Sequence, residues 1–139
     1  MPLKNTFRIC VLPGDGIGTE VTAAAVEILG AVSRCSGEFS LDFQNFAAGA
    51  VQYLASGVAM PEKSWQAAEE ADAIFLGAMG LPRVRYEDGT EITPQLDLRF
   101  RFDLYAGVRP VSARRGGPLV LRDSRADDVD FGLGRESTE

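Results

Sequence analysis

Histidine is absent from the 139 residues of this sequence. Its absence excludes serine–histidine–aspartate and cysteine–histidine catalysis, a histidine-ligated zinc site and an imidazole pH switch within these residues. Cysteine is rare: Cys10 and Cys35 are far apart and match no metal-binding spacing, so we expect two buried, reduced thiols. Apolar runs of about 18 residues are also missing, and we therefore expect no membrane-spanning segment and no membrane partner.

Basic residues are outnumbered by acidic ones. The chain carries 14 Lys and Arg against 20 Asp and Glu, a formal net charge of −6. Because a basic stripe is what attracts a nucleic-acid backbone, we expect no nucleic-acid partner. Residues 1–8 lack the apolar run of a secretory signal, so we expect a cytoplasmic protein. The hydrophobic share of 45% and the charged share of 24% are those of a globular domain with a buried core.

Strands and helices alternate through the first half of the chain. Residues 7–12 form an apolar run stopped by a Pro-Gly turn, and residues 39–43 alternate apolar and polar side chains as strands do. Short helices over residues 47–55 and 61–70 lead to a strand over 73–76. This order predicts an α/β sheet with parallel strand pairs, in which ligands bind beside the carboxyl ends of the strands. A helix after the first strand is indicated by apolar residues that share one helical face: Val21, Ala25, Ile28, Leu29 and Val32.

The second half of the chain is harder to assign. Residues 83–93 are polar and predict an exposed loop. Residues 96–104 alternate strictly, which favours a strand, whereas Thr93 followed by Pro94 is a good helix start. Further along, we expect strands over residues 107–111 and 129–133 and a turn over residues 114–118.

Three glycines, Gly14, Gly16 and Gly18, separate the first strand from the first helix. Glycines in this place allow a phosphate to approach backbone N–H groups at a helix N-terminus, which is one way of binding dinucleotides. The dinucleotide fingerprint is incomplete, because Thr19 stands where its last glycine is expected and Asp15 would repel a pyrophosphate. The sequence leaves two interpretations open: a phosphate-binding loop, or a tight turn that needs glycine for its backbone angles alone.

Four motifs follow one another in the chain: Leu12–Gly18 with Glu20-Val21, Ala71–Gly80, Leu98-Arg99 with Asp103–Pro110, and Asp130-Phe131 with Arg135–Glu139. In this order they resemble the β-decarboxylating dehydrogenases, the family of isopropylmalate, isocitrate and tartrate dehydrogenases. A single glycine motif would be a weak signal, whereas four ordered motifs over the whole chain are specific.

The resemblance implies an α/β fold of the isocitrate/isopropylmalate dehydrogenase type, a three-layer αβα architecture that would be truncated here. Residues 1–105 would form the N-terminal part of the first, cofactor-side domain, and residues 106–139 would begin the second domain, which carries substrate groups and the dimer interface. Family chains are much longer than this one. Their tyrosine acid, lysine base and metal-ligating aspartates are expected further along, so we assign no catalytic residue and no metal ligand here and expect the chain alone to be inactive.

The resemblance also implies an activity. Family members oxidise a small 2-hydroxy acid of the malate, tartrate or isopropylmalate type with NAD and Mg²⁺ or Mn²⁺, with decarboxylation where the substrate carries a β-carboxylate, and act as homodimers. By resemblance, Arg99, Arg109 and Arg135 bind the substrate carboxylates. A guanidinium suits this role because it stays charged and grips a carboxylate through two parallel N–H bonds. Ile17 and Thr93 are, by resemblance, the candidates for contact with NAD.

The resemblance changes the assignment of one segment from strand to helix, and it bears on which acid is the substrate. It makes the Arg99 segment helical, so we expect a helix over about residues 94–105 in spite of the strict alternation. Asp97 and Asp103 are candidates to pair with the arginines. Gln95 stands four residues before Arg99, where isopropylmalate enzymes have apolar residues. An amide buried beside an isopropyl group would lack hydrogen-bond partners, which favours a more polar substrate such as malate or tartrate.

Two functions of other classes stay open. A chain that is naturally of this length would be a non-catalytic α/β module that binds a small anion at the glycine loop. Alternatively, a fragment that exposes apolar sheet surface would associate with other chains and have a purely structural role. A dehydrogenase needs further sequence, the module predicts a soluble monomer, and the structural role predicts an obligate oligomer.

Overall fold

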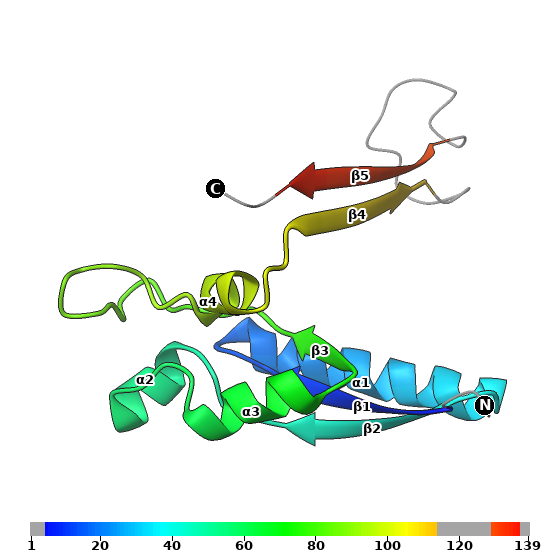
Figure 1. Ribbon diagram of the computed structural model, residues 1–139, viewed down its shortest axis with the longest axis horizontal. Coiled ribbons are helices and arrows are strands. Elements are labelled where there is room, and N and C mark those ends of the chain that lie inside the picture. The colour runs from blue at the N-terminus through cyan, green and yellow to red at the C-terminus, as the bar shows by residue number, and fades with distance from the viewer. Residues whose placement is uncertain (1–4, 114–128, 137–139) are drawn as a thin grey trace. The chain divides into compact units, whose positions relative to one another are not determined.

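The computed structural model of the protein describes residues 5–113 and 129–136. The chain forms two compact units, Met1–Asp97 and Leu98–Glu139. The domain boundary expected between residues 105 and 106 stays a prediction. The elements are β1 (Thr6–Leu12), α1 (Ile17–Ser36), β2 (Ser40–Asn45), α2 (Ala50–Ser56), α3 (Glu62–Glu70), β3 (Ala73–Leu76), α4 (Pro94–Arg101), β4 (Ala106–Ser112) and β5 (Asp130–Glu136) (Figure 1).

The first unit is built on a parallel sheet of three strands in the order β2–β1–β3. Ile9 of the central strand pairs with Phe43 on one side and with Ala73 on the other. Parallel neighbours need long crossover connections, and the helices supply them: α1 joins β1 to β2, while α2 and α3 join β2 to β3. The predicted α/β class with parallel strand pairs is confirmed.

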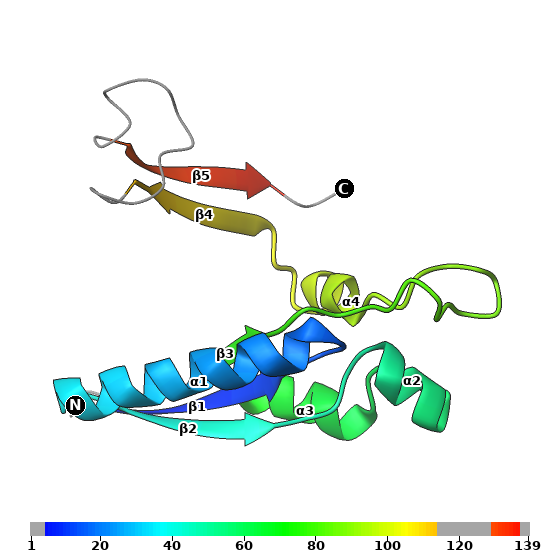
Figure 2. The ribbon, with the colours of Figure 1, turned by 180° about the vertical axis from the view of Figure 1, so that it is seen from behind.

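Helices cover both faces of this sheet, α1 on one face and α3 on the other, as the two opposite views show (Figures 1 and 2). A sheet that begins with the order 2–1–3 changes its direction of winding between its first and third strands, and ligands usually bind beside the carboxyl ends of those two strands. These ends meet in the structure, because Leu12 of β1 pairs with Leu76 of β3.

The core of the first unit has two parts. The carboxyl half of β1, residues 10–12, is almost fully buried, as a central strand with helices on both faces must be. A second and smaller cluster lies beside α2 and consists of Ala50, Ala59 and Ile92.

The α1 helix is confirmed, but the apolar face in its sequence is not the face that packs on the sheet. The buried side chains of α1 are small: Gly18, Thr22 and Ser33. Ile28 is 64% exposed and Val32 is 51% exposed. Small side chains let the helix approach the strands closely, so the apolar stripe turns away from them.

The two cysteines differ in burial. Cys10 is 1% exposed in β1, and its burial raises the pKa of the thiol. Cys35 is free and exposed in the last turn of α1, so the expectation of two buried thiols is wrong for this residue. The reason is its place on the helix, roughly 200° around the axis from the buried Ser33.

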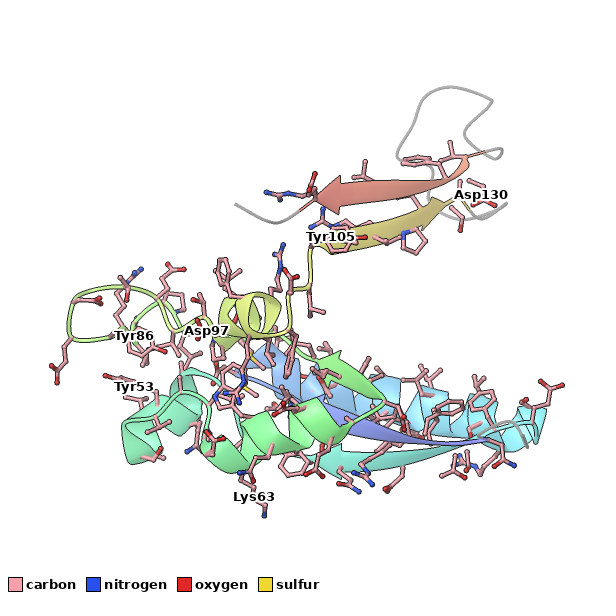
Figure 3. The ribbon with its side chains drawn as sticks, in the orientation of Figure 1. Tyr53, Lys63, Tyr86, Asp97, Tyr105 and Asp130 are labelled. Carbon is pink, nitrogen blue, oxygen red and sulfur yellow. The ribbon has the colours of Figure 1, made fainter. Side chains whose placement is uncertain are left out.

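Residues 83–93 are only partly the exposed loop that their polarity predicts. An isolated antiparallel bridge between Arg85 and Glu91 folds the segment back on itself. Tyr86 then packs edge-on against Tyr53 of α2, with 5.1 Å between the ring centroids (Figure 3). Ile92, at 1% exposure, belongs to the core. The loop is therefore attached to the unit through its apolar residues, which the polar composition did not reveal.

The α4 helix confirms the helical interpretation of the alternating segment, but it ends at Arg101 and not at Tyr105. Asp103 has a φ of 51°, and the N–H of Leu104 donates to the carbonyl of Arg99 at 2.9 Å. A left-handed residue with such a bond across the last turn ends a helix, and aspartate tolerates this conformation better than most residues.

The second unit contains the strand pair β4–β5, which is antiparallel, unlike the sheet of the first unit. The strands predicted over residues 107–111 and 129–133 are confirmed, with β5 extending to Glu136. The turn predicted over residues 114–118 lies outside the described residues. Within the described ranges, no helix is long and apolar enough to cross a membrane.

Candidate functional site

Two glycine-rich loops meet at the carboxyl ends of β1 and β3. The N–H of Gly77 donates to the carbonyl of Leu12 at 2.9 Å, and the N–H of Asp15 donates to the carbonyl of Ala78 at 2.8 Å. Gly14 adopts a φ of 77°, and a Cβ there would collide with the Ala78 carbonyl. Glycine is therefore required both by the backbone angle and by the approach of the second loop.

The Asp15 side chain lies beneath these loops and is 3% exposed. Its Oδ2 accepts hydrogen bonds from the N–H groups of Ala50 at 2.7 Å and Gly80 at 2.8 Å. Its Oδ1 accepts the N–H of Val51 at 2.8 Å. Hydrogen bonds to a carboxylate are roughly twice as strong as those between neutral groups. Asp15 thus connects the glycine loop with the start of α2 and with the segment after β3.

Two N–H groups in the first turn of α1 are already bonded to backbone carbonyls of the glycine loop. The N–H of Gly18 donates to the carbonyl of Asp15 at 2.8 Å, and the N–H of Thr19 donates to the carbonyl of Gly16 at 3.3 Å. With Asp15 buried beside them, these contacts favour the tight-turn interpretation of the glycine loop over the phosphate-binding one.

Sequence reasoning missed the role of Asp15. Its partners lie 35, 36 and 65 residues further along the chain, beyond the reach of any local pattern. The one available signal was a charged residue placed between glycines, which was interpreted only as unfavourable for a pyrophosphate.

A cavity of about 160 Å³ lies between the segment that follows β3 and the segment that enters α4. Thr93, a predicted cofactor residue, lines it. Ile17, the other one, is 62% exposed at the start of α1 and does not line this cavity. Most of the remaining lining residues are apolar or glycine, and two of them, Glu91 and Gln95, are polar. The set is Met79, Gly80, Leu81, Pro82, Glu91, Ile92 and Gln95.

Gln95 contributes a buried acceptor to the wall of this cavity. Its Oε1 has no solvent access and no hydrogen-bond partner among the described residues. A buried polar atom without a partner costs about 1–3 kcal/mol, so such atoms usually meet a water or a ligand. This oxygen is enclosed by the protein, whereas the residue Gln95 lines the cavity.

The second unit brings the three predicted substrate arginines together. Arg99, Arg109 and Arg135 line one hollow of about 280 Å³, together with Leu104, Ala106 and Gly107. Arginines from α4, β4 and β5 thus line one hollow, although their sequence positions are far apart.

The register of β4 and β5 explains how two of these arginines come to one face. Arg135 pairs with Gly107, and Arg109 pairs with Leu133, so both guanidiniums project from the same side of the strand pair as diagonal neighbours. The acidic Glu136 pairs with Ala106 and lies on the opposite side.

The ion pairs between described residues do not involve the arginines of this hollow. None of Arg99, Arg109 and Arg135 has an ion-pair partner in the part of the chain that the structure describes. The expected pairing of Asp97 or Asp103 with these arginines is not seen there. Arginines that share a hollow and lack ion-pair partners among the described residues have the chemistry that a small anion requires.

No metal centre is present among the described residues, since none of their His, Cys, Asp and Glu side chains form a group of three that could hold an ion. The expectation that this chain contains no metal ligand stays a prediction.

Comparison with known proteins points to one family. The family model described as isocitrate/isopropylmalate dehydrogenase matches residues 8–139. A probable tartrate dehydrogenase/decarboxylase of Agrobacterium vitis is 37% identical over 133 residues, which cover 96% of this chain and 37% of that protein. A 3-isopropylmalate dehydrogenase of Bifidobacterium longum is 37% identical over 140 residues, which cover 99% of this chain and 38% of that protein. The chain thus spans less than two fifths of the length of these relatives.

Solved structures agree with this relationship. A β-decarboxylating dehydrogenase from Thermococcus kodakarensis superposes with a TM-score of 0.72 at 28% identity, covering 96% of this chain and 34% of that chain. An isocitrate dehydrogenase from Methylococcus capsulatus superposes with a TM-score of 0.72 at 25% identity, covering 96% and 35% of the two chains.

Proposed function

Because this chain belongs to the isocitrate/isopropylmalate dehydrogenase family, we propose that it holds the substrate-arginine part of an NAD-dependent dehydrogenase of small 2-hydroxy acids. The observation that carries the proposal is the hollow lined by Arg99, Arg109 and Arg135, whose guanidiniums lack ion-pair partners among the described residues. A substrate with carboxylates supplies the missing negative charge.

The arginines bind and orient the acid. Arg109 and Arg135 project side by side from the strand pair and can each grip a carboxylate oxygen pair, while Arg99 approaches from α4. Binding at three points fixes the orientation of the C2 hydrogen, which lowers the entropic part of the barrier to its transfer. NAD, when bound, accepts that hydrogen as a hydride.

The cofactor side of the proposal involves Thr93 and Ile17. Thr93 lines the cavity of about 160 Å³ and offers a hydroxyl that can donate or accept a hydrogen bond. Ile17 offers an exposed apolar side chain beside the glycine loop. Within the described residues, the phosphates of NAD find no glycine-loop cradle, so they are not assigned to that loop.

We propose that the substrate is one of the more polar acids that members of the family oxidise. By resemblance, Gln95 stands where isopropylmalate enzymes have apolar residues, and an amide buried beside an alkyl group would lack hydrogen-bond partners. A probable tartrate dehydrogenase and a 3-isopropylmalate dehydrogenase are both 37% identical to this chain, so the preference for a polar acid rests on Gln95.

Dependence on Mg²⁺ or Mn²⁺, and decarboxylation of β-carboxylate substrates, enter the proposal through family membership alone. The described residues do not form a ligand set for a divalent ion. A cytoplasmic location has the same basis.

A homodimer is also part of the proposal. Val111, Phe131 and Leu133 share the arginine side of the β4–β5 pair and are 40%, 52% and 50% exposed. Apolar side chains that stay exposed on a strand pair favour contact with a second chain.

The test measures binding and turnover separately. Titration of the 139-residue chain with tartrate, malate and isopropylmalate should show binding that Arg109→Lys weakens about tenfold, because a lysine cannot form the bidentate contact. Arg83→Lys, which changes an exposed arginine outside the hollow, should leave the affinity unchanged. NADH formation with Mg²⁺ or Mn²⁺ is expected from the native protein if its intact mass exceeds the 15.0 kDa of this chain.

Three outcomes decide between the candidate functions. Binding without NADH formation by a native protein of 15.0 kDa would favour a non-catalytic anion-binding module. Equal effects of Arg109→Lys and Arg83→Lys would contradict the assignment of the arginine hollow. A 15.0 kDa protein that binds none of the acids and forms an obligate oligomer would favour a purely structural role.

A further inference from the structure

Asp15 is a buried acidic residue that the proposed chemistry does not use. It is 3% exposed and forms no ion pair with a described lysine or arginine. A buried charge is costly unless several hydrogen bonds satisfy it. An aspartate that only shapes a turn bonds the backbone about two residues further along, whereas Asp15 bonds residues 35, 36 and 65 positions away. Its role therefore extends beyond the glycine turn.

One oxygen of this carboxylate accepts hydrogen bonds from two separate segments of the chain. Oδ2 accepts the N–H of Ala50 at 2.7 Å and the N–H of Gly80 at 2.8 Å, so the start of α2 and the segment after β3 are bound to the same atom. Gly49 makes space for it, because a Cβ at that position would collide with the Asp15 carboxylate. The backbone of both segments is thus arranged around this side chain.

Gly80 connects the carboxylate to the cavity that Thr93 lines. Gly80 lies in the segment after β3, which forms one wall of the cavity. Ile92 lies in the segment before α4, which forms a second wall. The two walls are close, because a Cβ at Gly80 would lie 3.4 Å from the Ile92 carbonyl oxygen. The Asp15–Gly80 hydrogen bond therefore controls how near the first wall stands to Ile92 and Thr93.

We propose that Asp15 is a positioning residue: its carboxylate fixes Gly80 and thereby the width of the cavity lined by Thr93. The description of this cavity as a receptor for part of NAD rests on the function proposed above. Asp15 itself touches no ligand. An asparagine keeps one acceptor oxygen and presents an NH₂ group in place of the other, so Asp15→Asn cannot accept all three N–H bonds. Any bond to Ala50 or Gly80 that remains goes to a neutral oxygen and is roughly half as strong as a bond to a carboxylate.

The experiment compares Asp15→Asn with Asp88→Asn in the whole protein. Asp88 is a matched control because it also accepts a backbone N–H, that of Thr90 at 2.9 Å, but within an exposed local turn. Hydrogen exchange of the Gly80 and Ala50 amides should become about tenfold faster in Asp15→Asn, while the amides of β1 exchange as before. The dissociation constant for NAD should rise about tenfold, and Asp88→Asn should change neither quantity.

Several results would overturn the proposal. Faster exchange throughout β1 would mean that Asp15 acts on global stability alone, and unchanged exchange at Gly80 would remove the positioning role directly. Faster exchange at Gly80 with unchanged NAD affinity would show that the width of the cavity does not matter for the cofactor. If the unsubstituted protein binds no NAD, the proposed function fails, while Gly80 exchange still decides whether Asp15 fixes the wall.

A second variant covers the case in which Asp15→Asn does not fold. Asp15→Glu keeps the charge and both acceptor oxygens but moves them by one methylene. It should fold, and relative to the unsubstituted protein its exchange rate at Gly80 should increase more than the rates at the β1 amides. Unaltered exchange in Asp15→Glu would contradict a role that depends on where the carboxylate stands.

Discussion

Gly107 lies directly opposite Arg135 in the β4–β5 register, and both residues line the arginine hollow. Because Gly107 has no side chain, it contributes no side-chain atoms to the space beside its cross-strand partner Arg135. Gly107→Val should fill this space and lower the affinity for tartrate about tenfold, equivalent to ~1.4 kcal/mol, as measured by calorimetric titration. Valine suits a strand, so the fold should remain.

Gly132 provides the control for this prediction. It lies on β5 opposite Pro110, on the other side of the strand pair, and a Cβ there would meet nothing within 4 Å. Gly132→Val should leave the affinity unchanged. An equal loss in both variants would indicate a general effect on the strands and would contradict the role given to the space beside Arg135.

Much of the fold could be predicted because its signals are local. The Pro-Gly stop after β1 and the α4 start at Thr93 and Pro94 each involve neighbouring residues. The end of α4 was missed, because it depends on Asp103 adopting a left-handed conformation that many residues disfavour. The packing face of α1 was missed because small side chains, and not the apolar stripe, face the sheet.

The candidate site also has features that the sequence predicted and features that it did not. The three arginines were predicted through the family motifs, and the antiparallel register that brings Arg109 and Arg135 to one side was not, because pairing depends on residues far apart in sequence. The contacts of Asp15 were not predicted for the same reason. The orphan Oε1 of Gln95 could be recognised only once the cavity walls were known.

Gln95→Leu tests the energetic cost of that buried oxygen. Removing an unpartnered buried acceptor while keeping a similar volume should raise the free energy of unfolding by ~1 kcal/mol, as measured by urea denaturation. Gln66→Leu, at an exposed position of α3, should change the free energy by less than about 0.5 kcal/mol. If Gln95→Leu destabilises the protein, the oxygen has a hydrogen-bond partner in the folded state.

Two glycines of α1 should respond to alanine in opposite directions. A Cβ at Gly18 would collide with the carbonyls of Ala78 and Pro13, so Gly18→Ala should lower the free energy of unfolding by ~2 kcal/mol. At Gly30 the nearest atom is the flexible end of Arg34 at 3.3 Å, so Gly30→Ala should raise it by about 0.5–1 kcal/mol. Urea denaturation of both variants measures the difference. A stabilising Gly18→Ala would contradict the close contact between α1 and the second glycine loop.

Alkaline pH should destabilise the protein through Tyr86. Burial raises the pKa of its phenol above 10.0, and the nearby charges of Asp97, Tyr53 and Asp88 act in the same direction. The neutral phenol is the form that the fold accepts, so stability is unaffected below the unfolded pKa of about 10 and is lost as the pH rises from there through the folded pKa. Tyr86→Phe should keep the edge-on contact with Tyr53 and flatten the dependence of Tm on pH in this range. Identical pH profiles for the two proteins would show that the Tyr86 phenol is as accessible in the folded protein as in the unfolded chain.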